Sequence, residues 1–172
     1  MTARAAVPGL SHRARALWQF SLAVYGQAGV PAACLLLQDR HGADVNVLLY
    51  AGWRASQGEA LSEAGCRSAI ARSAKWRDEL VFPLRALRRR AGDLARENPS
   101  FGQAYASLKA CELQLERQQQ AMLADGSDQD CSASADVKTA LEVFAKSMSI
   151  QPDPAVRSAL AVIADAMAAA IR

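Results

Sequence analysis

The sequence has few of the residues from which catalytic and metal-binding motifs are built. It contains two histidines, His12 and His41, and four widely separated cysteines that form no CxxC pair. It has no Gly-rich phosphate-binding loop, and no spacing suggests a Ser-His-Asp or Cys-His pair. We therefore favour a non-enzymatic protein and expect neither a cofactor nor a metal.

Uninterrupted apolar segments are also missing. The most apolar stretch, residues 30–53, is broken by Asp39, Arg40, His41 and Asp44, so it is unsuited to spanning a bilayer. The N-terminal residues lack the apolar core and cleavage site of a signal peptide. Three of the four cysteines fall within apolar helical patterns, where a free thiol packs as a small hydrophobe, and free thiols are typical of a reducing compartment. We expect a cytoplasmic protein with no membrane partner.

Aromatic residues make up only 6% of the chain, β-branched residues are few and alanine is abundant. This composition favours helices over strands. The sequence therefore predicts an all-α fold. We expect a compact main helical domain over residues 11–124 with a long helix near 99–124. A flexible polar linker would follow at 125–136, and a C-terminal helical hairpin at 137–172.

Capping residues and prolines place the ends of the expected helices. Ser11, Asp44, Asn98 and Asp153 each precede an apolar periodic segment and are predicted N-caps. Gly42 is the predicted stop of the second helix. The expected helices cover residues 11–26, 31–40, 45–55, 62–73, 74–96, 99–124, 137–150 and 155–171.

Two segments leave room for other structures. Residues 45–50 also suit a buried strand, but no partner strand is evident, so we favour a helix. Pro83 lies inside the helix predicted at 74–96 and should kink or break it near Phe82. Apolar residues of that helix are spaced for one buried stripe: Trp76, Leu80, Leu84, Leu87 and Leu94.

A polar turn interrupts the apolar segment between the second and third helices. One interpretation is structural, with Asp44 as a cap, the amides bonded to the turn, and Gly42 in a special backbone conformation. The other is a ligand or hard-metal site built from Asp39, His41 and Asp44, although calcium loops space their acids differently. We favour the structural role. The candidate residues are Gln38, Asp39, His41, Asp44 and Asn46.

A basic helix is the second candidate site. Segment 65–97 holds nine of the twenty Lys and Arg residues against four acids. A solvated face paired with nearby acids is the favoured interpretation, and a phosphate-binding patch or a contact with the acidic segment 125–136 are the others. The patch would consist of Lys75, Arg77, Arg85, Arg88, Arg89 and Arg90.

Several short motifs resemble a family of small bacterial proteins of unknown function over about residues 15–123. The most specific is Cys34-Leu-x-Leu-Gln38-Asp39-x-x-Gly42-Ala43-Asp44-Val45-Asn46. The resemblance implies an all-helical cytosolic protein and supplies no activity. The other matching motifs are Leu17-Trp18-x-Phe20-Ser21, Trp76-Arg77 and Pro83-Leu84-Arg85-x-Leu87-Arg88-Arg89.

Three functions remain open from the sequence. The first is a protein-interaction or adaptor module of the bacterial cytosol that binds another protein through helix 99–124 and the basic helix. The second is a nucleic-acid-binding or regulatory protein that uses the basic helix 75–90, although no recognition motif accompanies it. The third is a small-ligand or enzyme site at the polar turn 38–46.

Overall fold

The computed structural model describes residues 9–126 and 136–171. Within these ranges the fold is all-α, as predicted, and contains no strand, so the alternative of a strand at 45–50 is wrong. A π-helical segment η1 (Arg77–Val81) and a short 3-10 helix η2 (Pro99–Phe101) accompany the α-helices. These are α1 (His12–Tyr25), α2 (Val30–His41), α3 (Val45–Ser56), α4 (Glu63–Trp76), α5 (Phe82–Glu97), α6 (Gly102–Ala124), α7 (Val137–Ser147) and α8 (Pro154–Ala170).

The four predicted N-caps are confirmed. The side chain of Ser11 accepts a hydrogen bond from the backbone N–H of Ala14, and Asp153 accepts one from Val156 in the same way. Asp44 caps α3, and Asn98 caps the 3-10 turn that leads into the long helix α6. Local polar spacing therefore determines where these helices begin.

The kink predicted near Phe82 takes the form of η1. The wider turn joins α4 and α5 into one helical run, with the N–H of Phe82 bonded to the carbonyl of Arg77. Pro83 has no N–H to donate and would crowd the preceding turn of an α-helix, so a local change in winding accommodates it.

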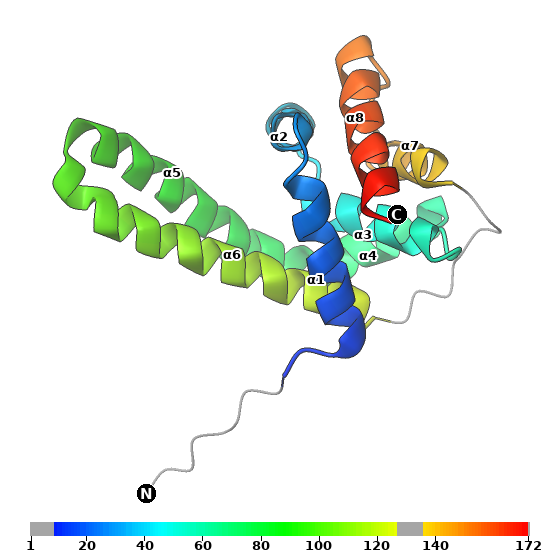
Figure 1. The fold of residues 1–172 in the computed structure, drawn as a ribbon, viewed down its shortest axis with the longest axis horizontal. Helices are drawn as coiled ribbons and strands as arrows, with labels where there is room; N and C mark the ends of the chain where they lie inside the picture. The colour runs from blue at the N-terminus through cyan, green and yellow to red at the C-terminus, as the bar shows by residue number, and fades with distance from the viewer. Residues whose placement is uncertain (1–8, 127–135, 172) are drawn as a thin grey trace, which may run out of the picture.

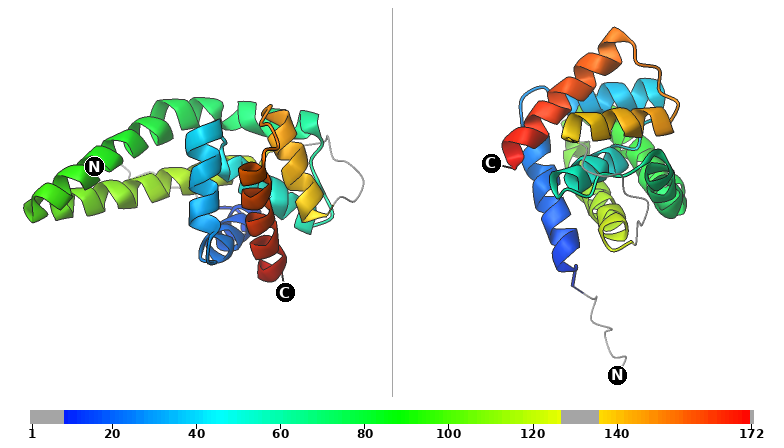
Figure 2. Two further views of the ribbon diagram at one scale, coloured as in Figure 1. Left: turned by 90° about the horizontal axis from the view of Figure 1, so that it is seen from above. Right: turned by 90° about the vertical axis from the view of Figure 1, so that its right-hand side faces the viewer.

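Helices α5 and α6 form a long hairpin arm that projects from the other helices, as Figures 1 and 2 show. The arm is two helices thick, so much of each helix faces solvent. No residue of α5 is fully buried, and Leu80 and Leu87 are exposed. The predicted buried stripe along 74–96 is therefore wrong.

The C-terminal helices pack into the main core. One cluster of buried apolar side chains joins Leu141 and Phe144 of α7 and Ile163 of α8 with residues of α1, α2 and α3. Met167 of α8 lies over Gly52 of α3, where a Cβ atom would come within 2.2 Å of its sulfur. The predicted C-terminal hairpin is thus confirmed, and it packs against the main core. Most of the predicted linker 125–136 lies outside the described residues.

None of the described helices is by itself long and apolar enough to cross a membrane. The pair α1 and α2 meets the requirement only when taken together, across a bend of 103°.

Candidate ligand-binding cavity

The polar turn is built by the end of α2 and the start of α3. Gly42 adopts a left-handed conformation with φ of 65°, and its N–H donates to the carbonyl of Gln38 at 3.0 Å. Asp44 Oδ1 then accepts from the backbone N–H groups of Asn46 and Val47 at 3.1 and 3.3 Å. A glycine stop and an aspartate cap thereby fix the corner between the two helices.

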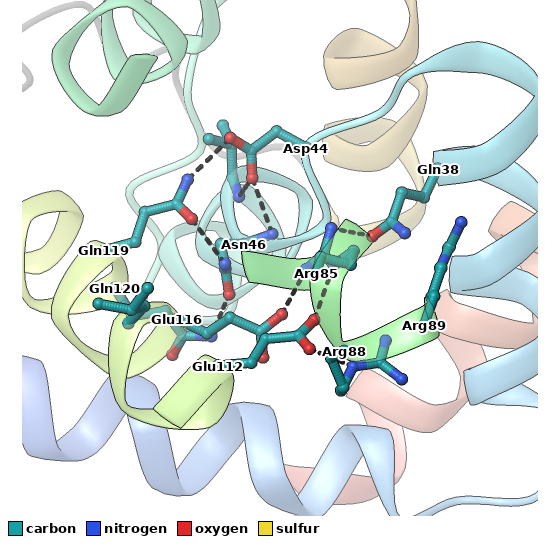
Figure 3. A network of polar contacts seen from close by, with 12 residues as sticks. Gln38, Asp44, Asn46, Arg85, Arg88, Arg89, Glu112, Glu116, Gln119 and Gln120 are labelled. Carbon is teal, nitrogen blue, oxygen red and sulfur yellow. Dashed lines mark hydrogen bonds and ion pairs between the residues drawn. The ribbon is translucent and has the colours of Figure 1, made fainter. Parts of the chain in front are cut away.

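Asn46 begins a chain of buried amide hydrogen bonds that joins three helices. Its Nδ2 donates to Gln119 Oε1 of α6 at 2.8 Å. Its Oδ1 accepts from Gln120 Nε2 at 2.9 Å, and Gln120 Oε1 accepts from the hydroxyl of Ser21 of α1 at 3.0 Å. Figure 3 shows the Asn46, Gln119 and Gln120 side chains converging on this point. Both ends of the Asn46 amide are therefore satisfied away from water. Its partners are side chains of α6, so the prediction that this amide bonds to the turn is wrong.

Asp44 extends this chain toward η1. Its Oδ2 accepts from Gln119 Nε2 at 2.8 Å and from Arg77 at 3.4 Å. Burial raises the pKa of Asp44, while Arg77 and the backbone donors act in the opposite direction. Gln119 also reaches the hydroxyl of Ser73 in α4 at 3.3 Å. The buried polar network therefore connects α1, α3, α4, η1 and α6.

Arg85 stands at the centre of a second set of contacts, at the base of the arm. Its Nε donates to Glu112 at 2.8 Å, and one terminal nitrogen donates to Gln38 Oε1 at 2.6 Å. The other terminal nitrogen pairs with Glu116. Burial disfavours the charged guanidinium, yet the two carboxylates raise the pKa of Arg85 overall. All three sides of this arginine are occupied, as Figure 3 shows.

The remaining basic residues divide into two groups. Arg88 pairs with the same Glu112, and Arg89 forms an exposed ion pair with Asp39 at 2.8 Å. Lys75 and Arg90 are exposed and lie apart from these contacts. The basic helix is therefore partly neutralised by α6 across the hairpin, which the spacing along one helix did not predict.

A cavity of about 560 Å³ lies between α1, α2, the start of α3, η1, α5 and α6. The polar network lines it with Asn46, Gln119 and Gln120, and the arginine cluster lines it with Arg85 and Glu112. Its apolar lining includes large side chains that are 39–49% exposed, more than is usual for such residues. These are Leu22, Tyr25, Leu35, Phe82 and Leu113.

The cavity brings together residues that the sequence assigned to two separate sites. From the polar turn it takes Gln38, Asp44 and Asn46, and from the basic helix it takes Arg77, Arg85, Arg88 and Arg89.

Other candidates lie outside the cavity. Asp39, His41, Lys75 and Arg90 do not line it. Asp39, His41 and Asp44 form no metal-binding group, and the described part of the chain contains no cluster of three or more His, Cys, Asp or Glu residues suited to a metal ion.

The sequence predicted none of the lining residues of α6, which include the acids Glu112 and Glu116 and the amides Gln119 and Gln120. Their spacing of four, three and one places these four residues on one face of a helix, as a polar stripe beside apolar positions such as Leu108 and Leu115. That stripe was a usable signal. It indicates no particular contact, because the partners of these side chains lie on distant segments.

Burial also raises the pKa of two groups on the cavity wall. Glu116 has a pKa raised by burial and by the neighbouring Glu112, with Arg85 acting against the shift. Burial raises the pKa of the Cys34 thiol to about 12, so it is protonated at neutral pH. The wall thus presents a shielded carboxylate and an unreactive thiol.

Comparison with known protein families gives a match. The family described as "Protein of unknown function (DUF2390)" matches residues 16–123, which include all residues that line the cavity. The range agrees with the resemblance over 15–123. Neither the comparison with curated proteins nor that with solved structures found a match.

Proposed function

The chain belongs to the DUF2390 family, whose function is not established, and from the geometry of the chain itself we propose that it binds a small organic ligand. The supporting observation is the convergence of the polar turn and the basic helix on one cavity. Its volume of about 560 Å³ is within the usual range of ligand pockets, roughly 300–1,000 Å³. Apolar walls and a few fixed polar groups are also typical of such pockets.

The state of two of the three cavity carboxylates, Asp44 and Glu112, favours binding over catalysis. Both oxygens of Asp44 accept hydrogen bonds, and both oxygens of Glu112 receive donors from Arg85 and Arg88. A general base needs a free oxygen within reach of the proton that it removes. Cys34, with its raised pKa, is equally unsuited to be a nucleophile. These groups hold the cavity in shape.

The arginine contacts weigh against nucleic acid as the partner. Arg85 and Arg88 are already paired with glutamates of α6 and are largely buried. Binding to a phosphate backbone needs accessible basic side chains, which displace the counterions condensed on the nucleic acid. Of the predicted patch, Arg89 and Arg90 on α5 and the more distant Lys75 remain exposed.

A neutral solvatochromic dye tests the proposal. N-phenylnaphthylamine should bind the purified protein at one site and increase in fluorescence, because the apolar walls exclude water from it. Ala110 of α6 is exposed and lines the cavity, so Ala110→Trp should obstruct binding. Ala104 is exposed on the same helix but does not line the cavity, so Ala104→Trp is the matched control. No dye uptake by the wild type, or equal uptake by both variants, would contradict the proposal.

The protein-interaction module is a second candidate, supported by the arm. Leu87 and Phe101 are 55% and 45% exposed there and lie outside the cavity. Such side chains suit an amphipathic helix of a partner protein. Photo-crosslinkers at these two positions should then capture one protein in cells. That purified protein should bind the wild type but not a Leu87→Asp, Phe101→Asp variant. Unchanged binding to the variant would exclude this role for the arm.

A further inference from the structure

We infer that the ligand is an amphipathic organic anion, with one carboxylate-type or phosphate-type head group and an apolar body. This inference rests on the proposed function and specifies the chemistry of the same cavity. It follows from the charge of the lining, from the way the charges are paired, and from the position of the exposed apolar side chains.

The lining carries an excess of positive charge. Its acidic residues are Asp44, Glu112 and Glu116, whereas its basic residues are Arg77, Arg85, Arg88, Arg89 and Lys109. Five bases against three acids leave a formal charge of +2 among the lining residues, and outside the lining Asp78 pairs with Arg77 and Asp39 with Arg89. A ligand anion would offset this excess, and a ligand cation would add to it.

The pairing separates the satisfied charges from the available ones. Glu112 and Glu116 are engaged by Arg85 and Arg88 where the arm meets the other helices. Lys109 is exposed and forms no ion pair with another described residue. Arg89 is 47% exposed, and its only ion pair within the described chain is with the 42% exposed Asp39. Exposed pairs of this kind are weak, so an incoming anion can replace Asp39 with little loss.

The exposed apolar side chains of the cavity provide a surface for the apolar part of the ligand. Leu22 and Tyr25 of α1, Leu35 of α2 and Leu113 of α6 line the cavity and are 44–49% exposed. They come from three helices and belong to the same lining as Arg89 and Lys109. An alkyl or aryl body would cover these side chains while its head group reaches the two bases. A small inorganic anion would leave them in water.

Competition among three probes with the same alkyl chain tests the head group. Dodecanoate, dodecanol and dodecyltrimethylammonium each displace bound N-phenylnaphthylamine, at concentrations below micelle formation. We expect dodecanoate to displace the dye at a concentration about tenfold or more below that of the cation, a difference of about 1.4 kcal/mol. Dodecanol should lie between them. Equal displacement by all three, or a preference for the cation, would overturn the inference.

Two variants connect the preference to its residues. Arg89→Met and Lys109→Met keep the length of an apolar stem but remove the charge, and both sites are exposed, so folding is retained. The ratio of the dodecanoate and dodecyltrimethylammonium affinities should fall toward one in the double variant. Arg90→Met is the control, because Arg90 is an exposed neighbour outside the lining.

Different results would contradict the proposed function and the inference that the ligand is an anion. A double variant that keeps the full preference would overturn the anion inference and leave the cavity as a binding site. Failure of the wild type to take up the neutral dye would overturn the proposed function itself.

Discussion

Gln119 Nε2 donates to Asp44 Oδ2 at 2.8 Å, although the two residues are 75 positions apart. The contact couples a local device, the N-cap of α3, to the long helix α6. Since Gln119 is 1% exposed and Asp44 is 4% exposed, water cannot readily replace either partner. The geometry of the polar turn therefore depends on α6 as much as on its own residues.

Gln119→Leu should destabilise the protein strongly. The change removes the acceptor of Asn46 Nδ2 and one donor to Asp44, and each buried polar group left without a partner costs about 1–3 kcal/mol. We expect a loss of about 2–4 kcal/mol in the free energy of unfolding. Urea denaturation followed by circular dichroism measures it.

Gln118→Leu is the control for this experiment. Gln118 is exposed on the same helix, and its replacement should change stability by no more than about 0.5 kcal/mol. Equal unfolding midpoints for the two variants would show that the buried amide network contributes nothing specific.

The Arg85–Glu112 pair should show clear energetic coupling. Their side chains are 14% and 8% exposed, and each keeps a second partner when the other is removed, so a single change should cost less than the roughly 3–5 kcal/mol of an isolated buried pair. In a double-mutant cycle of Arg85→Met and Glu112→Gln, we expect a coupling energy of about 1–3 kcal/mol. The exposed pair Arg96–Asp93 serves as the comparison, and its coupling should stay below about 1 kcal/mol. Similar coupling in both pairs would contradict the buried role of Arg85.

Gly52→Ala should weaken the attachment of the C-terminal helices. The new Cβ would lie 2.2 Å from the Met167 sulfur and 2.7 Å from its terminal methyl carbon. Such overpacking costs about 1–3 kcal/mol, less the gain of up to about 1 kcal/mol from replacing a helical glycine. Thermal unfolding measures the change.

Two further variants check this reasoning. Gly102→Ala meets no atom within 4 Å and should be neutral or slightly stabilising. In a Met167→Ala background the penalty of Gly52→Ala should shrink, because the clashing atoms are gone. An unchanged penalty in that background would show that the α3–α8 contact is not its cause.

Cys34 should resist alkylation in the folded protein. Burial raises its pKa from an ordinary value near 9 to about 12, so the thiolate is scarce at pH 9 and becomes abundant only above the folded pKa. Cys111 is exposed and should react readily. Iodoacetamide treatment at pH 8 and 9, followed by peptide mapping, compares the two sites. Equal modification of Cys34 and Cys111 without denaturant would contradict this expectation.

Local sequence rules predicted the helix ends well. Ser11, Asp44, Asn98 and Asp153 act as caps because a short polar side chain can reach the backbone two or three residues ahead. The disruption expected from Pro83 was also placed correctly, although its form as a π-helical turn was not specified. These features depend on neighbours in the sequence, so a single sequence contains the information.

These local rules could not predict contacts between distant segments. Arg85 was assigned to a solvated face because acids on its own helix seemed the nearest partners, yet it pairs with Glu112 and Glu116 across the hairpin. Leu87 was assigned to a buried stripe but is 55% exposed, because the arm has only two layers. Helical spacing tells which residues share a face and not which face is covered.

The π-helical turn makes the angular position of the arm depend on residue count. A π-helical turn holds one residue more than an α-helical turn, so a one-residue deletion within Arg77–Val81 would leave an ordinary α-helical turn. Each residue of an α-helix adds about 100° of rotation, so a one-residue insertion would instead turn α5 by about that angle relative to α4. Arg85 would then face away from Glu112, and Phe82 would leave the cavity. In this short segment, an insertion is therefore far more consequential than a deletion or a substitution.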